Sequence, residues 1–118
     1  MLTKMLPGKN RLKEEKDFLF VKNKGKRYKS KNFLIQYVFR NELKDCRFGI
    51  IVNKEVSPHA SLRNKTTRAI REGIRRNLYC LNGKYDCVVI AFPSIAKVYT
   101  ADILIEITEA LAACGLCK

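Results

Sequence analysis

The spacing of apolar and polar residues along the chain predicts three helices and three strands. Apolar residues recur at helical spacing in residues 10–23, 62–78 and 100–113. Runs that are apolar on both sides predict strands at residues 33–39, 47–53 and 85–92. We expect the first two strands to pair as an antiparallel hairpin across a polar turn. The third is almost continuously apolar, which favours the centre of a sheet.

Turn and capping residues set the expected boundaries. Residues 1–9 read as a flexible basic lead-in, broken at Pro7-Gly8. The predicted N-caps are Asn10, Ser61 and Thr100, and the predicted stops are Gly25, Asn82-Gly83 and Gly115. Residues 24–32 form a basic loop around Tyr28, and residues 54–61 form a loop or a short strand. In the first helix, Leu12, Leu19 and Phe20 are predicted to share one side, with Phe18 and Val21 pointing elsewhere.

Of the three predicted helices, the one at residues 62–78 separates apolar from charged residues most sharply. Its apolar side gathers Leu62, Ala69, Ile70, Gly73 and Ile74. Its other side carries a stripe of Arg68, Arg71 and Arg75, bordered by Asn64, Lys65 and Arg76. Glu72 is the single acid, so the positive charges repel one another along the helix. A bound polyanion would offset that repulsion, and we interpret this side as a nucleic-acid contact in preference to a solvated face.

The chain of 118 residues carries a net charge of +13, and the charge is unevenly placed. Residues 1–31 contain eleven Lys and Arg against three acids, and residues 63–76 contain six against one. Residues 77–118 are close to neutral. The apolar fraction of 47% is that of one globular domain. The basic helix has no large aromatic anchors, so a membrane-surface role is disfavoured, and no run is long enough to span a membrane.

Few residues suit catalysis or metal binding. His59 is the only histidine and reads as a surface imidazole. The five cysteines are odd in number and scattered, which predicts reduced thiols in a cytosolic protein. Cys114 and Cys117 have metal-like spacing, but a structural zinc needs four ligands, which disfavours a zinc site there. Asp17, Asp86 and Glu14 are the best acid candidates, and none has a partner at suggestive spacing. If the protein serves a nuclease, we expect another molecule to perform the chemistry.

The order of these segments resembles the bacterial ribonuclease P protein component from about Lys9 to Leu111. The most specific marker is the arginine-rich helix, which opens with Arg63-Asn64-Lys65 here and with Arg-Asn-Arg in the family. The second marker is Asn10-Arg11-Leu12 followed by Asp17-Phe18. The strands FLIQYV, RFGIIVNK and YDCVVIAFP lie between and after these markers in the family order.

The resemblance implies a single α+β domain with a four-stranded mixed sheet and three helices, in α-β-β-β-α-β-α order. It also implies a left-handed βαβ crossover, as in the second domain of ribosomal protein S5. In that family a catalytic RNA removes the 5′ leader of precursor tRNA with Mg²⁺ held mainly by RNA. The protein binds the catalytic RNA and the leader. A cytoplasmic location is implied, and no protein oligomer is required.

The resemblance also assigns residues to two binding surfaces, with no catalytic residue and no metal ligand. The residues assigned to RNA binding are Arg63, Asn64, Lys65, Arg68, Arg71, Arg75, Lys54, Asn10 and Arg11. The leader cleft is assigned Phe18, Lys22 and Gln36. Lys22 and Gln36 stand where many members have aromatics, so we expect this cleft to rely less on stacking and more on charge. In the helix, Lys65 replaces the second arginine of the motif, which keeps the charge but loses the bidentate hydrogen bonding of a guanidinium. From the residues alone, Phe18 suits a core position as well as a ligand contact.

Two other functions fit the same residues. One is a non-catalytic RNA-binding protein of ribosomal or chaperone type, which the RNA that copurifies would distinguish. The other is a nuclease that acts alone, which the missing acid, base and metal set disfavours.

Overall fold

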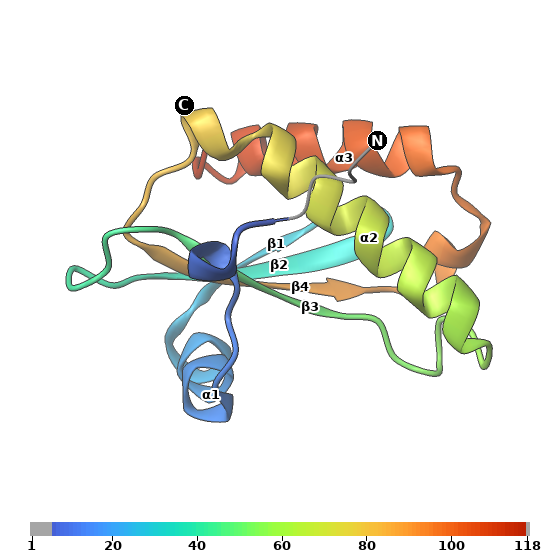
Figure 1. Ribbon diagram of the computed structural model, residues 1–118, viewed down its shortest axis with the longest axis horizontal. Helices are drawn as coiled ribbons and strands as arrows, with labels where there is room; N and C mark the ends of the chain where they lie inside the picture. Colours follow the sequence, from blue (N-terminus) through green and yellow to red (C-terminus); the bar gives the residue numbers. More distant parts are fainter. Residues whose placement is uncertain (1–5, 118) are drawn as a thin grey trace.

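Three helices and four strands follow one another in the computed structural model, which describes residues 6–117 (Figure 1). In chain order they are α1 (Glu15–Lys24), β1 (Lys26–Lys29), β2 (Phe33–Phe39), β3 (Arg47–Ile51), α2 (Ala60–Arg76), β4 (Tyr85–Ala91) and α3 (Thr100–Ala113). Short 3-10 segments are η1 (Gly8–Asn10), η2 (Leu78–Cys80) and η3 (Pro93–Lys97). This order confirms the predicted α+β class.

The strands form one mixed sheet in the order β1-β2-β4-β3. β2 is antiparallel to both β1 and β4, whereas β3 is parallel to β4. The predicted hairpin of β2 and β3 is therefore wrong, because β4 lies between them. β4 buries five of its seven residues, and the central position covers both of its faces. A parallel pair needs a crossover connection, which α2 supplies between β3 and β4.

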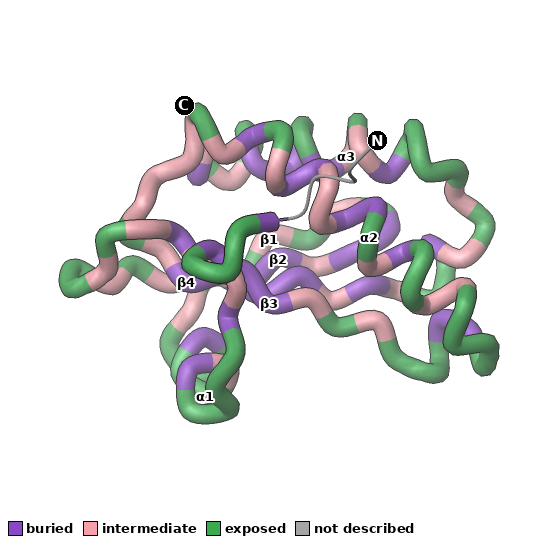
Figure 2. Tube along the Cα trace, viewed as in Figure 1, coloured by how far each residue is buried: buried purple, intermediate pink, exposed green. Residues whose placement is uncertain are grey.

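Helices cover the two faces of the sheet unequally. α2 and α3 lie against one face and α1 against the other (Figures 1 and 2). The main core lies between the sheet and α2 and α3, and its fully buried members include Phe33, Ile35, Ile70, Val89, Ile107 and Leu111. A smaller core of Leu12, Val21 and Val88 lies beneath α1. Since alternate strand residues face opposite layers, β2 and β4 read as apolar on both sides.

The N-terminal region differs from its prediction. The first helix begins at Glu15 and not at Asn10, whose side-chain amide is buried and donates a hydrogen bond to the Cys46 carbonyl at 2.8 Å. The backbone N–H of Leu12 donates to the Phe48 carbonyl at 2.9 Å, which holds this stretch against β3. Leu6 is only 2% exposed, so residues 6–9 are no free lead-in; residues 1–5 lie outside the described part.

The side of α1 on which Leu12 lies was predicted wrongly, whereas the separation of Phe18 and Val21 from Leu19 and Phe20 was predicted correctly. Val21 is fully buried with Leu12 beneath the helix, and Phe18 packs partly against them. Leu19 and Phe20 are the exposed residues, at 48% and 39%. The helix starts five residues later than predicted, so Leu12 lies before it. The stop at Gly25 is confirmed.

Several local boundaries also move. The basic segment predicted as a loop contains the edge strand β1, and β3 ends at Ile51. The residue before α2 is His59, which is exposed, and the helix begins before the predicted cap Ser61. α3 begins at Thr100 with Tyr99 in the cap position, and Gly115 follows it with a positive φ of 85°.

Cys80 and Cys117 form a disulfide, so the prediction of five reduced thiols is wrong for these two. α2 and α3 pack side by side, and a Cβ on Gly73 would lie only 3.0 Å from Ile107. The segments that follow the two helices therefore meet, and the Cα atoms of the two cysteines are 5.0 Å apart. Cys46, Cys87 and Cys114 remain free thiols.

Candidate nucleic-acid interface

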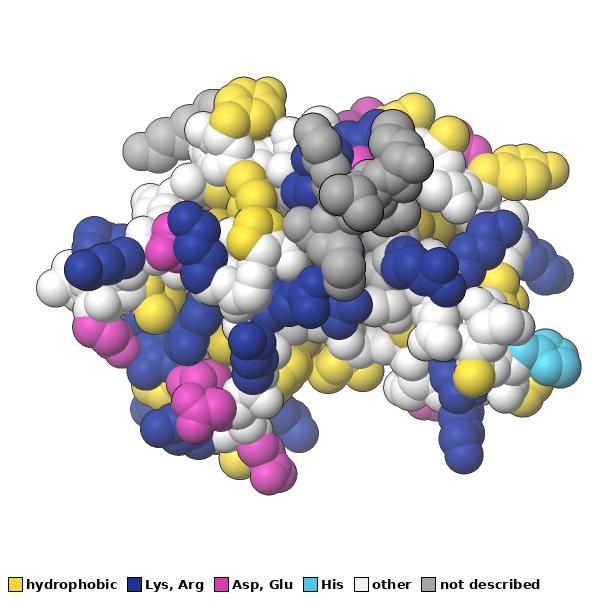
Figure 3. Space-filling model, viewed as in Figure 1, with side chains coloured by type: hydrophobic (Ala, Val, Ile, Leu, Met, Phe, Trp, Pro, Cys, Tyr) yellow, Lys and Arg dark blue, Asp and Glu magenta, His cyan; other side chains and the backbone are white. Residues whose placement is uncertain are grey.

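α2 has the two faces that its sequence predicts. Its buried face consists of Thr66, Ala69, Ile70, Gly73 and Ile74, whereas Leu62 is only half-buried. The opposite face carries the basic side chains, and Lys and Arg are prominent on the side of the molecule that α2 occupies (Figure 3). Burial of one side fixes the direction in which the other side presents its charges.

Part of the predicted arginine stripe is compensated. The Glu72 carboxylate accepts hydrogen bonds from the guanidinium groups of Arg75 at 2.7 Å and of Arg76 at 2.8 Å. These contacts, that of Arg75 first, lower the pKa of Glu72 to about 2. Arg75 therefore differs from Arg68 and Arg71, with which the sequence grouped it.

The middle and first turns of α2 hold cations that are less constrained. Lys65 and Arg68 are exposed, and neither has an ion pair or a side-chain hydrogen bond within residues 6–117. Asn64 and Lys54 are also exposed. Arg63 is half-buried and donates to the Ser57 carbonyl at 2.9 Å, so it ties the start of the helix to the preceding loop.

Arg71 and Arg11 are like charges that repel each other. Partial burial, and then the charge of Arg11, lower the pKa of the Arg71 guanidinium. Arg11 donates from its Nε to the Leu6 carbonyl at 3.0 Å, and Arg71 has no side-chain hydrogen bond within the described residues. A nearby anion would offset this repulsion. Asn10, assigned to RNA binding, is instead buried at 5% exposure, so it acts by holding the backbone next to Arg11.

The other face of the sheet is only partly covered by α1. The strand register aligns Lys29, Leu34, Ile90 and Ile51 in one row across all four strands. Each of them is exposed or half-buried. We call this set the open row; it combines apolar side chains with a basic edge strand.

The predicted cleft residues are placed beside α1. Phe18 is half-buried, and its ring lies so close to Gly49 that a Cβ there would collide with it. Gln36 is buried at 6% exposure, so it offers little surface to a ligand. Lys22 is exposed and follows Phe18 by one helical turn, on the same side of α1. The packing of Phe18 favours the core interpretation of this residue.

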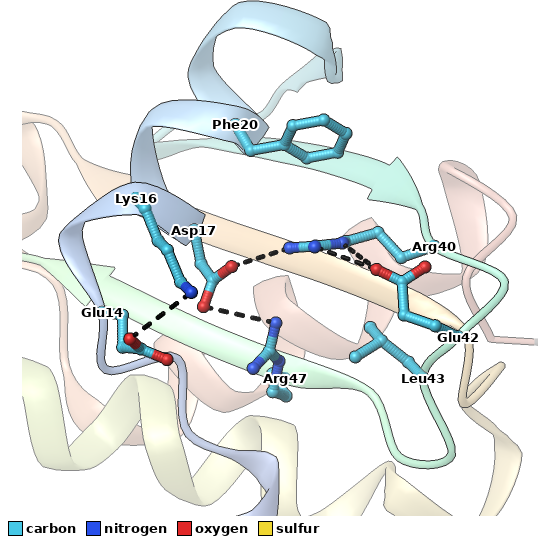
Figure 4. A pocket seen from close by; sticks show the side chains of 8 residues that line it. All are labelled: Glu14, Lys16, Asp17, Phe20, Arg40, Glu42, Leu43 and Arg47. Atoms are coloured by element: carbon cyan, nitrogen blue, oxygen red, sulfur yellow. Dashed lines mark hydrogen bonds and ion pairs between the residues drawn. The ribbon is translucent and has the colours of Figure 1, made fainter.

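Asp17 and Asp86 come together beneath α1 with Arg40 and Arg47, an ion-pair network that the sequence did not predict. Figure 4 shows the part of it that joins Asp17 to Arg40 and Arg47. Arg40 donates to Asp17 at 2.8 Å and to Asp86 at 3.0 Å, and Arg47 donates to both Asp86 oxygens at 2.8 and 2.7 Å. These carboxylates raise the pKa of both arginines. A carboxylate buried within an apolar strand requires a cationic partner, so Asp86 was the residue from which this network could have been predicted.

The described residues offer little other chemistry. Both buried carboxylates are occupied by guanidinium groups, so neither is free to act as a base. No three His, Cys, Asp or Glu side chains between residues 6 and 117 come together as a metal site. Among the same residues, no helix combines the length and apolar character needed to cross a bilayer.

Comparisons with known proteins agree on one family. The sequence model described as Ribonuclease P matches residues 6–115. A ribonuclease P protein component of Synechocystis is 35% identical over 88 residues, 75% of this chain and 71% of the relative. That of Dictyoglomus turgidum is 41% identical over 88 residues, 74% of this chain and 71% of the relative.

Solved structures give the same result. The RNase P protein of Staphylococcus aureus superposes with a TM-score of 0.86 at 28% identity, covering 92% of this chain and 98% of that one. The RNase P protein of Thermotoga maritima gives a TM-score of 0.77 at 26% identity, covering 87% and 96%.

Proposed function

The chain belongs to the ribonuclease P protein family, and we propose that it binds the catalytic RNA through α2 and the 5′ leader of precursor tRNA on the open row. Family membership makes it a protein subunit of the ribonuclease P holoenzyme and a partner of ribonuclease P RNA. The assignment of α2 to the catalytic RNA rests on the group of uncompensated cations on this helix. Lys65, Arg68 and Arg71 are paired with no acid in residues 6–117.

Phosphates of the catalytic RNA would contact this group together with Arg11. The Arg11–Arg71 pair supplies two guanidinium groups whose mutual repulsion a phosphate relieves. Arg68 and Lys65 extend the same positive surface towards the first turn of α2, where Asn64 adds hydrogen bonding. Lys54 lies in the loop before the helix and extends it further.

The leader would lie across the open row. Leu34, Ile51 and Ile90 provide apolar contact for bases, and Lys29 and Lys22 provide charge for the backbone. Since Phe18 and Gln36 are largely packed, they would shape one wall of this surface and present little stacking area. Contact here would therefore depend more on charge than on aromatic stacking.

Cleavage itself would be the work of the RNA, with Mg²⁺ held mainly by the RNA and none assigned to this chain. Support comes from the two buried carboxylates, whose oxygens already accept hydrogen bonds from Arg40 and Arg47. Because precursor tRNA matures where it is transcribed, we place this activity in the cytoplasm.

Reconstitution tests the proposal. Purified protein, freed of RNA, is combined with ribonuclease P RNA and precursor tRNA at a Mg²⁺ concentration too low for the RNA alone. We expect leader removal only when both components are present. Leader release by the protein alone at comparable rates would contradict the division of labour, and no gain over RNA alone would refute the assigned function.

A further inference from the structure

A hollow lies beside the first turns of α1, at the opposite ends of β2 and β3 from the open row. It is a cavity of about 470 Å³, within the size range of small-molecule sites. Its walls come from α1, from the end of β2 and the turn after it, and from the start of β3: Glu14, Lys16, Asp17, Phe20, Arg40, Glu42, Leu43 and Arg47 (Figure 4). The open row contains Leu34 and Ile51, at the opposite ends of β2 and β3. The two surfaces are therefore distinct.

Phe20 is an aromatic ring presented to this cavity on a rigid support. It is 39% exposed, and the guanidinium carbon of Arg40 lies 4.7 Å from its ring centroid. Arg40 is itself fixed by Asp17 at 2.8 Å, by Asp86 at 3.0 Å and by Glu42 at 2.9 Å. Neither partner needs to be ordered when a ligand arrives, which lowers the entropic cost of binding.

The charges of the cavity disfavour an anion. Its lining contains three acids and three bases, and both arginines already bind carboxylates. A phosphate would therefore have to displace an existing partner. Glu14 and Glu42 are exposed at the rim, with side chains 65% and 63% accessible, and can accept hydrogen bonds; Lys16 can donate. A neutral planar group with polar edges suits a ring flanked by such acceptors and donors.

We propose that this cavity binds one unstacked nucleobase of an RNA bound to the protein, with the base stacked on Phe20. The net charge of +13 on the whole chain would bring the RNA backbone near, and the neutral cavity would accept a base in place of a phosphate. The inference rests on the proposed function, since it takes RNA as the partner. It adds a base contact outside both surfaces described above.

The chain contains no tryptophan, so Phe20→Trp gives a single fluorescent reporter that keeps the stacking surface. Titrate it with oligoadenylate, with oligouridylate and with an abasic ribose-phosphate oligomer of equal length. We expect quenching by the base-containing oligomers and little by the abasic one. Leu19→Trp is the matched control, because Leu19 is exposed on the same helix but does not line the cavity. Equal quenching in both variants, or by the abasic oligomer, would overturn the proposal.

Phe20→Ala then measures the contribution to RNA binding. Loss of one stacked base lowers affinity about 5- to 150-fold, and we expect a loss in that range for single-stranded RNA, with Leu19→Ala unchanged. Melting temperature confirms that both variants fold. Quenching of the tryptophan fluorescence by oligolysine but not by RNA would show a site for a basic peptide and would also overturn the proposal. Normal reconstitution with no base-dependent quenching refutes this inference alone, whereas failed reconstitution of the unsubstituted protein refutes the proposed function.

Discussion

Asp86→Asn tests whether the ion-pair network beneath α1 holds the domain together. Asp86 is fully buried and accepts three hydrogen bonds from Arg40 and Arg47. Asparagine keeps the size of the side chain but removes its charge. Arg40 and Arg47 would then share Asp17 as their remaining buried acceptor.

Breaking a buried ion pair by removing one partner costs about 3–5 kcal/mol. Arg40 and Arg47 retain 21% and 24% side-chain accessibility, so water can solvate part of their charge. We therefore expect the lower end, about 3 kcal/mol. For a domain of this size, that corresponds to a fall in melting temperature of roughly 10–15 °C.

Chemical and thermal denaturation measure this effect. Glu42→Gln is the control, because Glu42 binds the same Arg40 from an exposed position and its loss should change the melting temperature little. Affinity for the catalytic RNA should be unchanged at temperatures where the variant is folded, since α2 lies on the other face of the sheet. A melting temperature for Asp86→Asn equal to that of Glu42→Gln would refute the reasoning.

Three further predictions concern other parts of the molecule. Phe18→Ala should lower stability by up to about 3 kcal/mol while leaving discrimination between leader-bearing and mature tRNA little changed, measured by melting and by binding of the two RNAs. Glu72 has a lowered pKa, so its contribution to the stability of the fold should be present above about pH 4.5 and lost as pH falls towards 2. Glu72→Gln should remove this dependence when the melting temperature is measured against pH. Reducing the Cys80–Cys117 disulfide should destabilise the fold by about 2–4 kcal/mol in denaturant titrations, and deleting residues 114–118 should cost more, because Leu116 is only 2% exposed.

The sequence predicted what depends on local periodicity. The buried face of α2, the helix α3 and the strand β2 all lie where the spacing of apolar residues places them. α2 and α3 bury one side against the sheet, and β2 lies within the sheet between helices on its two faces, so pattern and packing agree. The family resemblance supplied the fourth strand and the order of elements.

Contacts between distant residues were not predictable in this way. β4 enters between β2 and β3, which nothing in the turn after β2 indicates. Asn10 was read as a helix cap because its side chain suits one, yet it bonds to Cys46, 36 residues away. Asp17 and Asp86 are 69 positions apart, and only the crossing of α1 over the sheet brings them to the same arginines.

The salt dependence of binding to ribonuclease P RNA tests the central assignment most directly. Arg68→Ala with Arg71→Ala removes two uncompensated cations of α2, whereas Lys31→Ala with Lys97→Ala removes the same charge from exposed positions elsewhere. Each lost phosphate contact lowers the slope of log K against log salt by roughly 0.7–0.9, so the α2 variant should weaken binding and lose about 1.4–1.8 from the slope. The Lys31 and Lys97 variant should stay near the unsubstituted protein. An unchanged slope and affinity for the α2 variant would contradict the assignment of α2 as the RNA-binding surface.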